Sequence, residues 1–234
     1  MERRTLTAAV GVNVGLLILA GLVQMLGAAQ GTGTIRGVVT MDDPLPVSTL
    51  EVNADQAVCG DMVPDESVIA DASGHVANAV VRVTGLSWPT TVGPPTIDNV
   101  RCRFEPHVQI AQTRSQLLVT SQDDTLHSTH AYDDRNRTEF NIAMPFSGLE
   151  VNRPLRRPGA VRIECDSHSW MRGWVVVSND FGVVTGPDGT FTLEEVPAGV
   201  HELTIWHERL GAESQTATVV VGEATEVAFK LEQL

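Results

Sequence analysis

This 234-residue chain is divided into short apolar runs, and this pattern constrains its fold more than any other feature. Runs rich in Val, Ile and Thr are separated by clusters of Gly, Pro, Asn or Asp, a pattern typical of β-strands and turns. No stretch keeps a 3.6-residue period long enough for a core helix, which predicts an all-β chain of sandwich type. The expected strands are Thr34–Thr40, Val76–Val83, Gln116–Thr120, Val161–Cys165, Trp174–Val177, Thr190–Leu193, Glu202–Trp206, Thr216–Val221 and Glu226–Leu231.

The N-terminus predicts export. Glu2, Arg3 and Arg4 precede an apolar run without charged residues from Leu6 to Ala29, and that run ends in small residues. Residues 1–29 therefore resemble a signal peptide, although the run is also long enough to be an uncleaved membrane anchor. Both interpretations place residues 30–234 outside the cytoplasmic membrane, in a periplasmic or other extracytoplasmic location where disulfides form.

The charge balance excludes nucleic acid as a partner. Lys and Arg number 16 against 29 Asp and Glu, a net charge of −13. Removal of residues 1–29 would change this to −14. Such a field repels a polyanion and favours a partner with a basic face.

The last third of the chain has a second, different pattern. The segment TGPDGTFTL (185–193) predicts a hairpin around a Pro-Asp-Gly turn, and VPAGV (196–200) predicts a second turn. Residues 181–234 thereby resemble the carboxypeptidase regulatory-like, prealbumin-like domain, a smaller β-sandwich that acts as a structural or interaction module. The usual first strands of that domain are similar to Gly33–Thr40 and Val76–Val83, so residues 33–86 are compatible with the first part of a split, interleaved sandwich.

The chemistry lies in the segment CDSHSWM, residues 165–171. A thiol, an imidazole and a thioether occur within seven residues, directly after a strand whose alternation places Cys165 on the same face as Val161 and Ile163. Together these are soft ligands, and a Cys, two His and a weak Met ligand suit blue copper. A second imidazole is offered by LHSTH (126–130), where strand parity allows either His127 or His130, but not both, to face the site.

These motifs resemble the cupredoxins of the amicyanin and plastocyanin type. The likeness spans residues 97–178 and rests on CDSHSWMRGWVVV, on LHSTH and on the strand that begins RFEPHVQI. The resemblance implies a Greek-key β-sandwich that holds one type 1 copper ion through His127, Cys165, His168 and Met171. Two prolines of the family loop are Ser167 and Ser169 here, and the Asn that braces the loop is Ser128.

The other two cysteines are expected to pair. In an oxidising compartment a Cys59–Cys102 disulfide leaves Cys165 free for the metal, whereas a disulfide through Cys165 would abolish the site. Closing a loop of about 43 residues stabilises the fold by about 4 kcal/mol in the chain-entropy model.

The resulting expectation is a single-electron carrier and not an enzyme. Trp170 is either a core aromatic or part of an apolar patch through which electrons leave by way of a solvent-edge His168. The expected partner is a redox protein such as a c-type cytochrome or a periplasmic dehydrogenase, with the N-terminal segment as a membrane tether if it is retained. The alternative is a copper-binding or structural protein of the cell envelope without a shuttle role.

Overall fold

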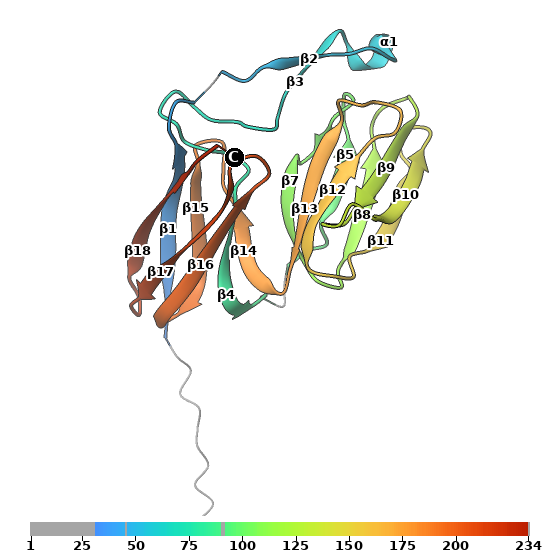
Figure 1. Cartoon of the computed structure of the whole chain (residues 1–234). Coiled ribbons are helices and arrows are strands. Elements are labelled where there is room, and N and C mark those ends of the chain that lie inside the picture. Colours follow the sequence, from blue (N-terminus) through green and yellow to red (C-terminus); the bar gives the residue numbers. More distant parts are fainter. Residues whose placement is uncertain (1–30, 45, 90–91, 234) are drawn as a thin grey trace, which may run out of the picture.

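The computed structural model describes residues 31–44, 46–89 and 92–233, and most of them form strands. Two β-sandwiches stand side by side, and one excursion of the chain passes over their upper ends (Figure 1). Within the described part, helix is confined to the single turn α1 (Gln56–Cys59). The prediction of an all-β sandwich architecture is confirmed.

The first sandwich is built from both ends of the chain. Its three-stranded sheet has the order β15-β1-β18 and its four-stranded sheet the order β14-β4-β16-β17. A core that includes Ile35, Val81, Leu203 and Ile205 fills the space between them. The strands are β1 (Thr32–Met41), β4 (Val80–Ser87), β14 (Asp180–Val184), β15 (Thr190–Pro197), β16 (Gly199–His207), β17 (Gly211–Val219) and β18 (Ala224–Leu231).

The second sandwich lies in sequence between β4 and β14. Its sheets have the orders β10-β9-β12-β13-β7 and β11-β8-β5-β6, and their core includes Phe104, Leu117, Ile163 and Val175. The strands are β5 (Thr96–Asn99), β6 (Phe104–Glu105), β7 (Val108–Gln112), β8 (Gln116–Ser121), β9 (His127–Tyr132), β10 (Thr138–Met144), β11 (Glu150–Pro154), β12 (Gly159–Glu164) and β13 (Arg172–Ser178).

Strand alternation positions the functional side chains. In β9 the residues His127, Thr129 and Ala131 are buried, and the residues between them face outward. In β12 the buried positions are Val161 and Ile163, and Cys165 follows on the same face. Antiparallel pairing sets Ile163 opposite Ala131, so the first residue of β9 and the residue after β12 come to the same end of the sandwich.

The predicted hairpin around the Pro-Asp-Gly turn is wrong. The turn is present, with Gly189 at φ +69°, but it joins β14 of one sheet to β15 of the other. Turn residues reverse the chain locally, whereas strand partners are decided by which apolar face each strand buries. Here β15 pairs with β1, and the turn carries the chain across the sandwich.

The two sandwiches are joined by a packed interface. Val80 of the first sandwich packs in one apolar cluster with Val108 and Val176 of the second. The rings of Trp174 and Trp206 meet edge to face, with 5.3 Å between their centroids. Next to this cluster His107 of the second sandwich forms a buried ion pair with Glu208 of the first. Apolar packing and a buried polar pair therefore fix the two sandwiches against each other.

The excursion between β1 and β4 covers one end of the second sandwich. We call residues 49–66 the cap; it contains β2 (Thr49–Glu51), α1 and β3 (Met62–Pro64). Its side chains Val52 and Val63 belong to the core of the second sandwich, and a disulfide joins Cys59 to Cys102. Although the cap is connected in sequence to the first sandwich, it packs on the second (Figure 1).

The predicted signal or anchor segment, residues 1–29, lies outside the described residues. Among the described helices none has the length and apolar character that crossing a bilayer requires.

The interface makes stability dependent on pH. The pKa of His207 is lowered to about 4, mainly because the ring is buried; Glu208 opposes this shift and nearby His107 adds to it. His207 is therefore neutral in the folded protein between pH 6.5 and 4, where an unfolded histidine takes up a proton. Stability is lost as the pH falls through this window, by about 2 kcal/mol between pH 7.5 and 5 for this one group.

Urea unfolding at the two pH values tests this, with His207→Asn as the comparison. We expect the wild type to lose about 2 kcal/mol more than the variant on acidification. An equal loss in both proteins would show that His207 is not the responsible group.

Candidate metal centre

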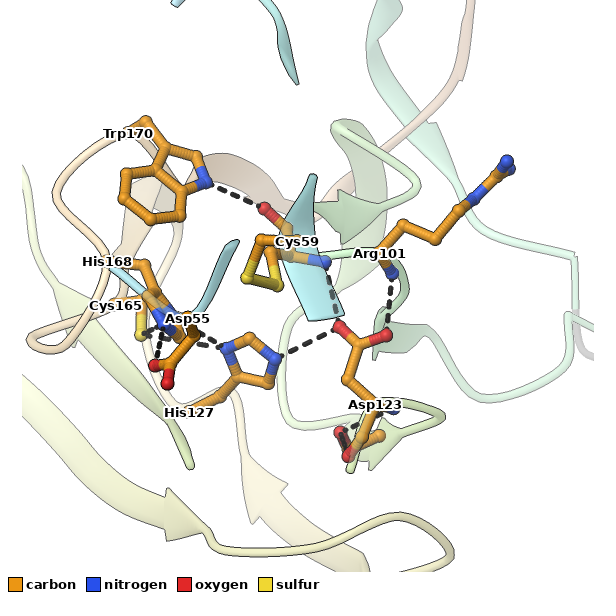
Figure 2. The surroundings of a disulfide bond; sticks show 10 residues. Asp55, Cys59, Arg101, Asp123, His127, Cys165, His168 and Trp170 are labelled. Atoms are coloured by element: carbon orange, nitrogen blue, oxygen red, sulfur yellow. Dashed lines mark hydrogen bonds and ion pairs between the residues drawn. A yellow bond between two sulfur atoms is a disulfide. The ribbon is translucent and has the colours of Figure 1, made fainter. Parts of the chain in front are cut away.

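Three potential ligand atoms meet at the capped end of the second sandwich (Figure 2). Nδ1 of His127 lies 2.9 Å from Nδ1 of His168 and 4.0 Å from Sγ of Cys165, and the latter two atoms are 3.7 Å apart. The His127 and His168 side chains are fully buried, and Cys165 is 4% exposed. His127 is the first residue of β9, Cys165 directly follows β12, and His168 lies in the loop that leads into β13.

The loop from Cys165 to Met171 is closed by its own backbone. The Met171 N–H donates to the His168 carbonyl at 3.0 Å, and the Cys165 N–H donates to the Met171 carbonyl at 3.4 Å. Met171 is buried in the same core cluster as Cys165. The structure thus brings the thioether residue to the same end of the sandwich as the other three expected ligands.

His130 lies on the opposite face of β9. Its Nδ1 is 2.9 Å from Asp166 and its Nε2 is 2.9 Å from Thr138, while its ring stacks on Tyr132. From the sequence, strand alternation allowed either His127 or His130 to face the site. In the structure it directs His127 inward and His130 outward. Of the two, the structure brings His127 to Cys165.

Ser128 braces the cysteine loop. Its backbone N–H donates to Sγ of Cys165 at 3.3 Å, and its hydroxyl accepts from the Asp166 N–H at 2.7 Å. The carboxylate of Asp166 points away from the thiol, and its pKa is lowered by hydrogen bonds from His130 and Asn141. The thiol thus receives a backbone donor, and the neighbouring charge faces solvent.

Each inward imidazole is held from behind by a carboxylate that sequence reasoning missed. Nε2 of His127 lies 3.0 Å from Oδ2 of Asp123, and Nε2 of His168 lies 2.8 Å from Oδ2 of Asp55 (Figure 2). Asp123 is four residues before His127 and could have been suspected from that spacing. Asp55 is 113 residues from His168, and no local pattern connects the two.

Asp123 also holds the loop that carries the disulfide. Its two carboxylate oxygens accept the backbone N–H groups of Arg101 at 2.7 Å and Cys102 at 2.8 Å. Both residues have positive φ, so this tight loop needs a partner for its amide groups. One buried carboxylate therefore fixes a backbone loop and an imidazole together.

Two ring nitrogens face each other inside the site. A carboxylate accepts a hydrogen bond from each Nε2, which directs the two Nδ1 atoms toward each other at 2.9 Å. Burial and the adjacent His168 lower the pKa of His127, which favours its neutral form. Two ring nitrogens 2.9 Å apart beside a cysteine sulfur are suitable ligands for a cation.

The expectation that His168 lies at the solvent edge is wrong. Its side chain is fully buried because the cap covers it and places Asp55 on its outer nitrogen. Trp170 is partly buried, its ring lies 5.0 Å from that of His168, and its indole N–H donates to the Cys102 carbonyl at 3.1 Å. His168 is therefore shielded from solvent, with the cap on its outer nitrogen and the indole beside its ring.

The disulfide joins Cys59 to Cys102 and leaves Cys165 with a free, buried thiol. The competing arrangement, with Cys165 in a disulfide, is not the one in the structure.

Comparisons with known proteins give partial structural similarity. No protein-family model and no curated protein matches the chain. A purple cupredoxin from Nitrosopumilus maritimus matches with a TM-score of 0.33 and 18% identity over 36% of this chain and 99% of that one. A reduced Cu(I) form of an amicyanin variant matches with a TM-score of 0.32 and 15% identity, covering 42% of this chain and 98% of that one.

A copper-containing nitrite reductase from Thermus scotoductus gives a further match, with a TM-score of 0.31 and 19% identity. That match covers 39% of this chain and 25% of the reductase chain. None of these three matches covers half of this chain.

Loss of Asp123 is expected to destabilise the protein even without metal. Asp123→Ala leaves the Cys102 amide and the His127 ring without their acceptor, which costs about 1–3 kcal/mol for each unsatisfied buried group. Chemical unfolding of the metal-free protein measures this. Asp124→Ala, which removes an exposed neighbouring carboxylate, should change the free energy of unfolding by less than about 0.5 kcal/mol, and equal effects would contradict the assignment.

Proposed function

We propose that this protein is an exported type 1 copper protein that transfers single electrons. The observation that carries the proposal is the convergence of Nδ1 of His127, Nδ1 of His168 and Sγ of Cys165 within one buried cluster. Two imidazole nitrogens and a cysteine sulfur together form a set of ligands that suits a soft cation. Met171, buried beside them, adds the thioether expected of a weak fourth ligand.

Copper is favoured over zinc by this donor set. Thiolate and imidazole suit both metals, whereas a thioether favours copper. The bound ion would supply a centre that gains and loses one electron. The chain's own contribution is to hold the ligands in nearly one arrangement for both states, through the closed loop from Cys165 to Met171 and the two carboxylates.

The burial of the centre supports electron transfer and not catalysis. The three donor residues are at most 4% exposed, so a substrate has no direct access to them. Among the described residues, both groups found with metal-ligand spacing include His127, and one of them contains the disulfide-bonded Cys102. We infer that the protein is not an enzyme.

We further propose that the first sandwich is a prealbumin-like interaction module, with residues 33–86 and 181–234 as its two parts, except that the cap (residues 49–66) packs on the second sandwich. The pairing of β1 with both β15 and β18 supports this division. Residues 97–178 would then form the cupredoxin domain. The proposed location is periplasmic or otherwise extracytoplasmic, with residues 1–29 as signal or tether; the Cys59–Cys102 disulfide supports an oxidising compartment.

Copper titration of the purified metal-free protein tests the proposal. Cu(II) should give an intense visible absorption from the thiolate, with a stoichiometry of one ion per chain. Cys165→Ser and His127→Ala should abolish this absorption, whereas His130→Ala should retain it because His130 faces the other side of β9. A colourless protein that binds only zinc would contradict the proposal.

A second candidate function is copper retention without a shuttle role. The buried imidazole of His168 favours copper retention, because an electron carrier works faster when one ligand imidazole lies close to its redox partner. Voltammetry separates the two functions: fast, reversible one-electron cycling supports the carrier, whereas slow or absent reduction of a protein that still binds copper supports retention.

The acidic surface determines the partner that we propose. The cap contains five carboxylates and no Lys or Arg; Glu51, Asp55 and Asp61 are exposed, whereas Glu66 is paired with Arg103. A redox partner with a basic docking face, such as a c-type cytochrome or a periplasmic dehydrogenase, matches this charge.

Stopped-flow oxidation of the copper-loaded, reduced protein by a basic c-type cytochrome measures this preference. The second-order rate constant should fall at least several-fold as ionic strength rises from about 10 to about 200 mM, because screening removes the attraction: the Debye length is roughly 30 Å at 10 mM and already about 8 Å at 150 mM. An acidic cytochrome should show the opposite trend, and a salt-independent rate with both would contradict docking at the acidic surface.

A further inference from the structure

The cap delivers one residue to the candidate centre from a distant part of the sequence. Asp55 precedes α1, and its carboxylate lies 2.8 Å from Nε2 of His168. An Asp at this position of a helix normally accepts a hydrogen bond from the first-turn amides. Here the side chain makes no capping bond, and it is directed at His168 instead.

The backbone at Asp55 is held in an uncommon conformation. Its φ of +50° places it in the left-handed region, which costs a residue with a Cβ about 1 kcal/mol or more. The carbonyl of Asp55 accepts the N–H groups of Val58 and Cys59, both at 2.9 Å. A local conformation of this kind persists when surrounding contacts hold it, and the disulfide at Cys59, in the same helical turn, ties this segment to Cys102.

The disulfide connects the two carboxylates that support the imidazoles. Cys59 lies in the same helical turn as Asp55, and the N–H of Cys102 donates to Asp123, which in turn holds His127. One covalent bond therefore fixes the positions of both supporting groups relative to the Cys165 loop (Figure 2).

We propose that Asp55 is a positioning residue for His168 and that the Cys59–Cys102 disulfide keeps it in place, so that the cap controls how fast the centre releases its metal. This inference rests on the proposed copper function. Outer partners of metal-bound imidazoles typically change metal affinity by about 10–100-fold. The competing explanation is an ordinary surface ion pair, which would contribute nothing measurable to the metal.

The first test compares single substitutions on the copper-loaded full chain. The readouts are the rate of copper transfer to an excess of chelator and the position and intensity of the thiolate absorption. Asp55→Ala should accelerate copper loss about 10-fold and shift the absorption. Asp55→Asn retains an acceptor oxygen and should fall between Asp55→Ala and the wild type.

Asp61→Ala is the matched control. Asp61 is an exposed acid on the same cap, so the substitution removes the same charge without touching His168. It should leave both the rate and the spectrum at wild-type values. Equal rates for Asp55→Ala, Asp61→Ala and the wild type would overturn the inference.

The second test asks whether the disulfide acts through Asp55. The double variant Cys59→Ala/Cys102→Ala should lose copper about as fast as Asp55→Ala, and adding Asp55→Ala to it should cause no further acceleration, since both changes remove one interaction. Additive effects would assign the disulfide a separate, purely stabilising role. If the wild type shows no thiolate absorption at all, the proposed function fails; if it shows one that these variants do not change, only this inference fails.

Discussion

The disulfide between Cys59 and Cys102 is the constraint on which the rest of this site depends. It attaches the cap, an insertion between two strands of the first sandwich, to the end of the second sandwich where His127, Cys165 and His168 meet. It also uses the two cysteines that could otherwise oxidise with Cys165. A loop of 43 residues closed in this way is stabilised by about 4 kcal/mol in the chain-entropy model, enough to hold a short segment with little secondary structure of its own.

Hydrogen bonding explains why the buried site has two acids. Two imidazoles and a cysteine sulfur meet in an apolar core, where each polar atom needs a partner. Asp123 and Asp55 accept the outer ring protons and so direct both Nδ1 atoms inward. In the proposed copper protein this arrangement would hold the ligands in place before the metal binds and so would lower the reorganisation that binding or electron transfer requires.

Strand-level features were predictable from the sequence because they depend on short-range patterns. The runs around Val161 and Val175 alternate or remain apolar over a few residues, and the structure has strands there. The tight spacing of Cys165, His168 and Met171 likewise placed these residues in one loop. The hairpin after β14 was predicted wrongly because a turn does not specify which sheet its strands join. Asp55 and the covered His168 were inaccessible to sequence reasoning, since a contact across 113 residues depends on where the cap packs.

The central claim is that the chain presents three specific atoms to one copper ion beneath an intact, disulfide-bound cap. A high-resolution crystal structure of the copper-loaded full-length protein tests this most directly. The account predicts one copper ion bonded to Nδ1 of His127, Nδ1 of His168 and Sγ of Cys165, with Asp55 and Asp123 still on the outer nitrogens and the Cys59–Cys102 bond closed. Copper bound through Nε2 of either histidine, or at a site that omits Cys165, would contradict it.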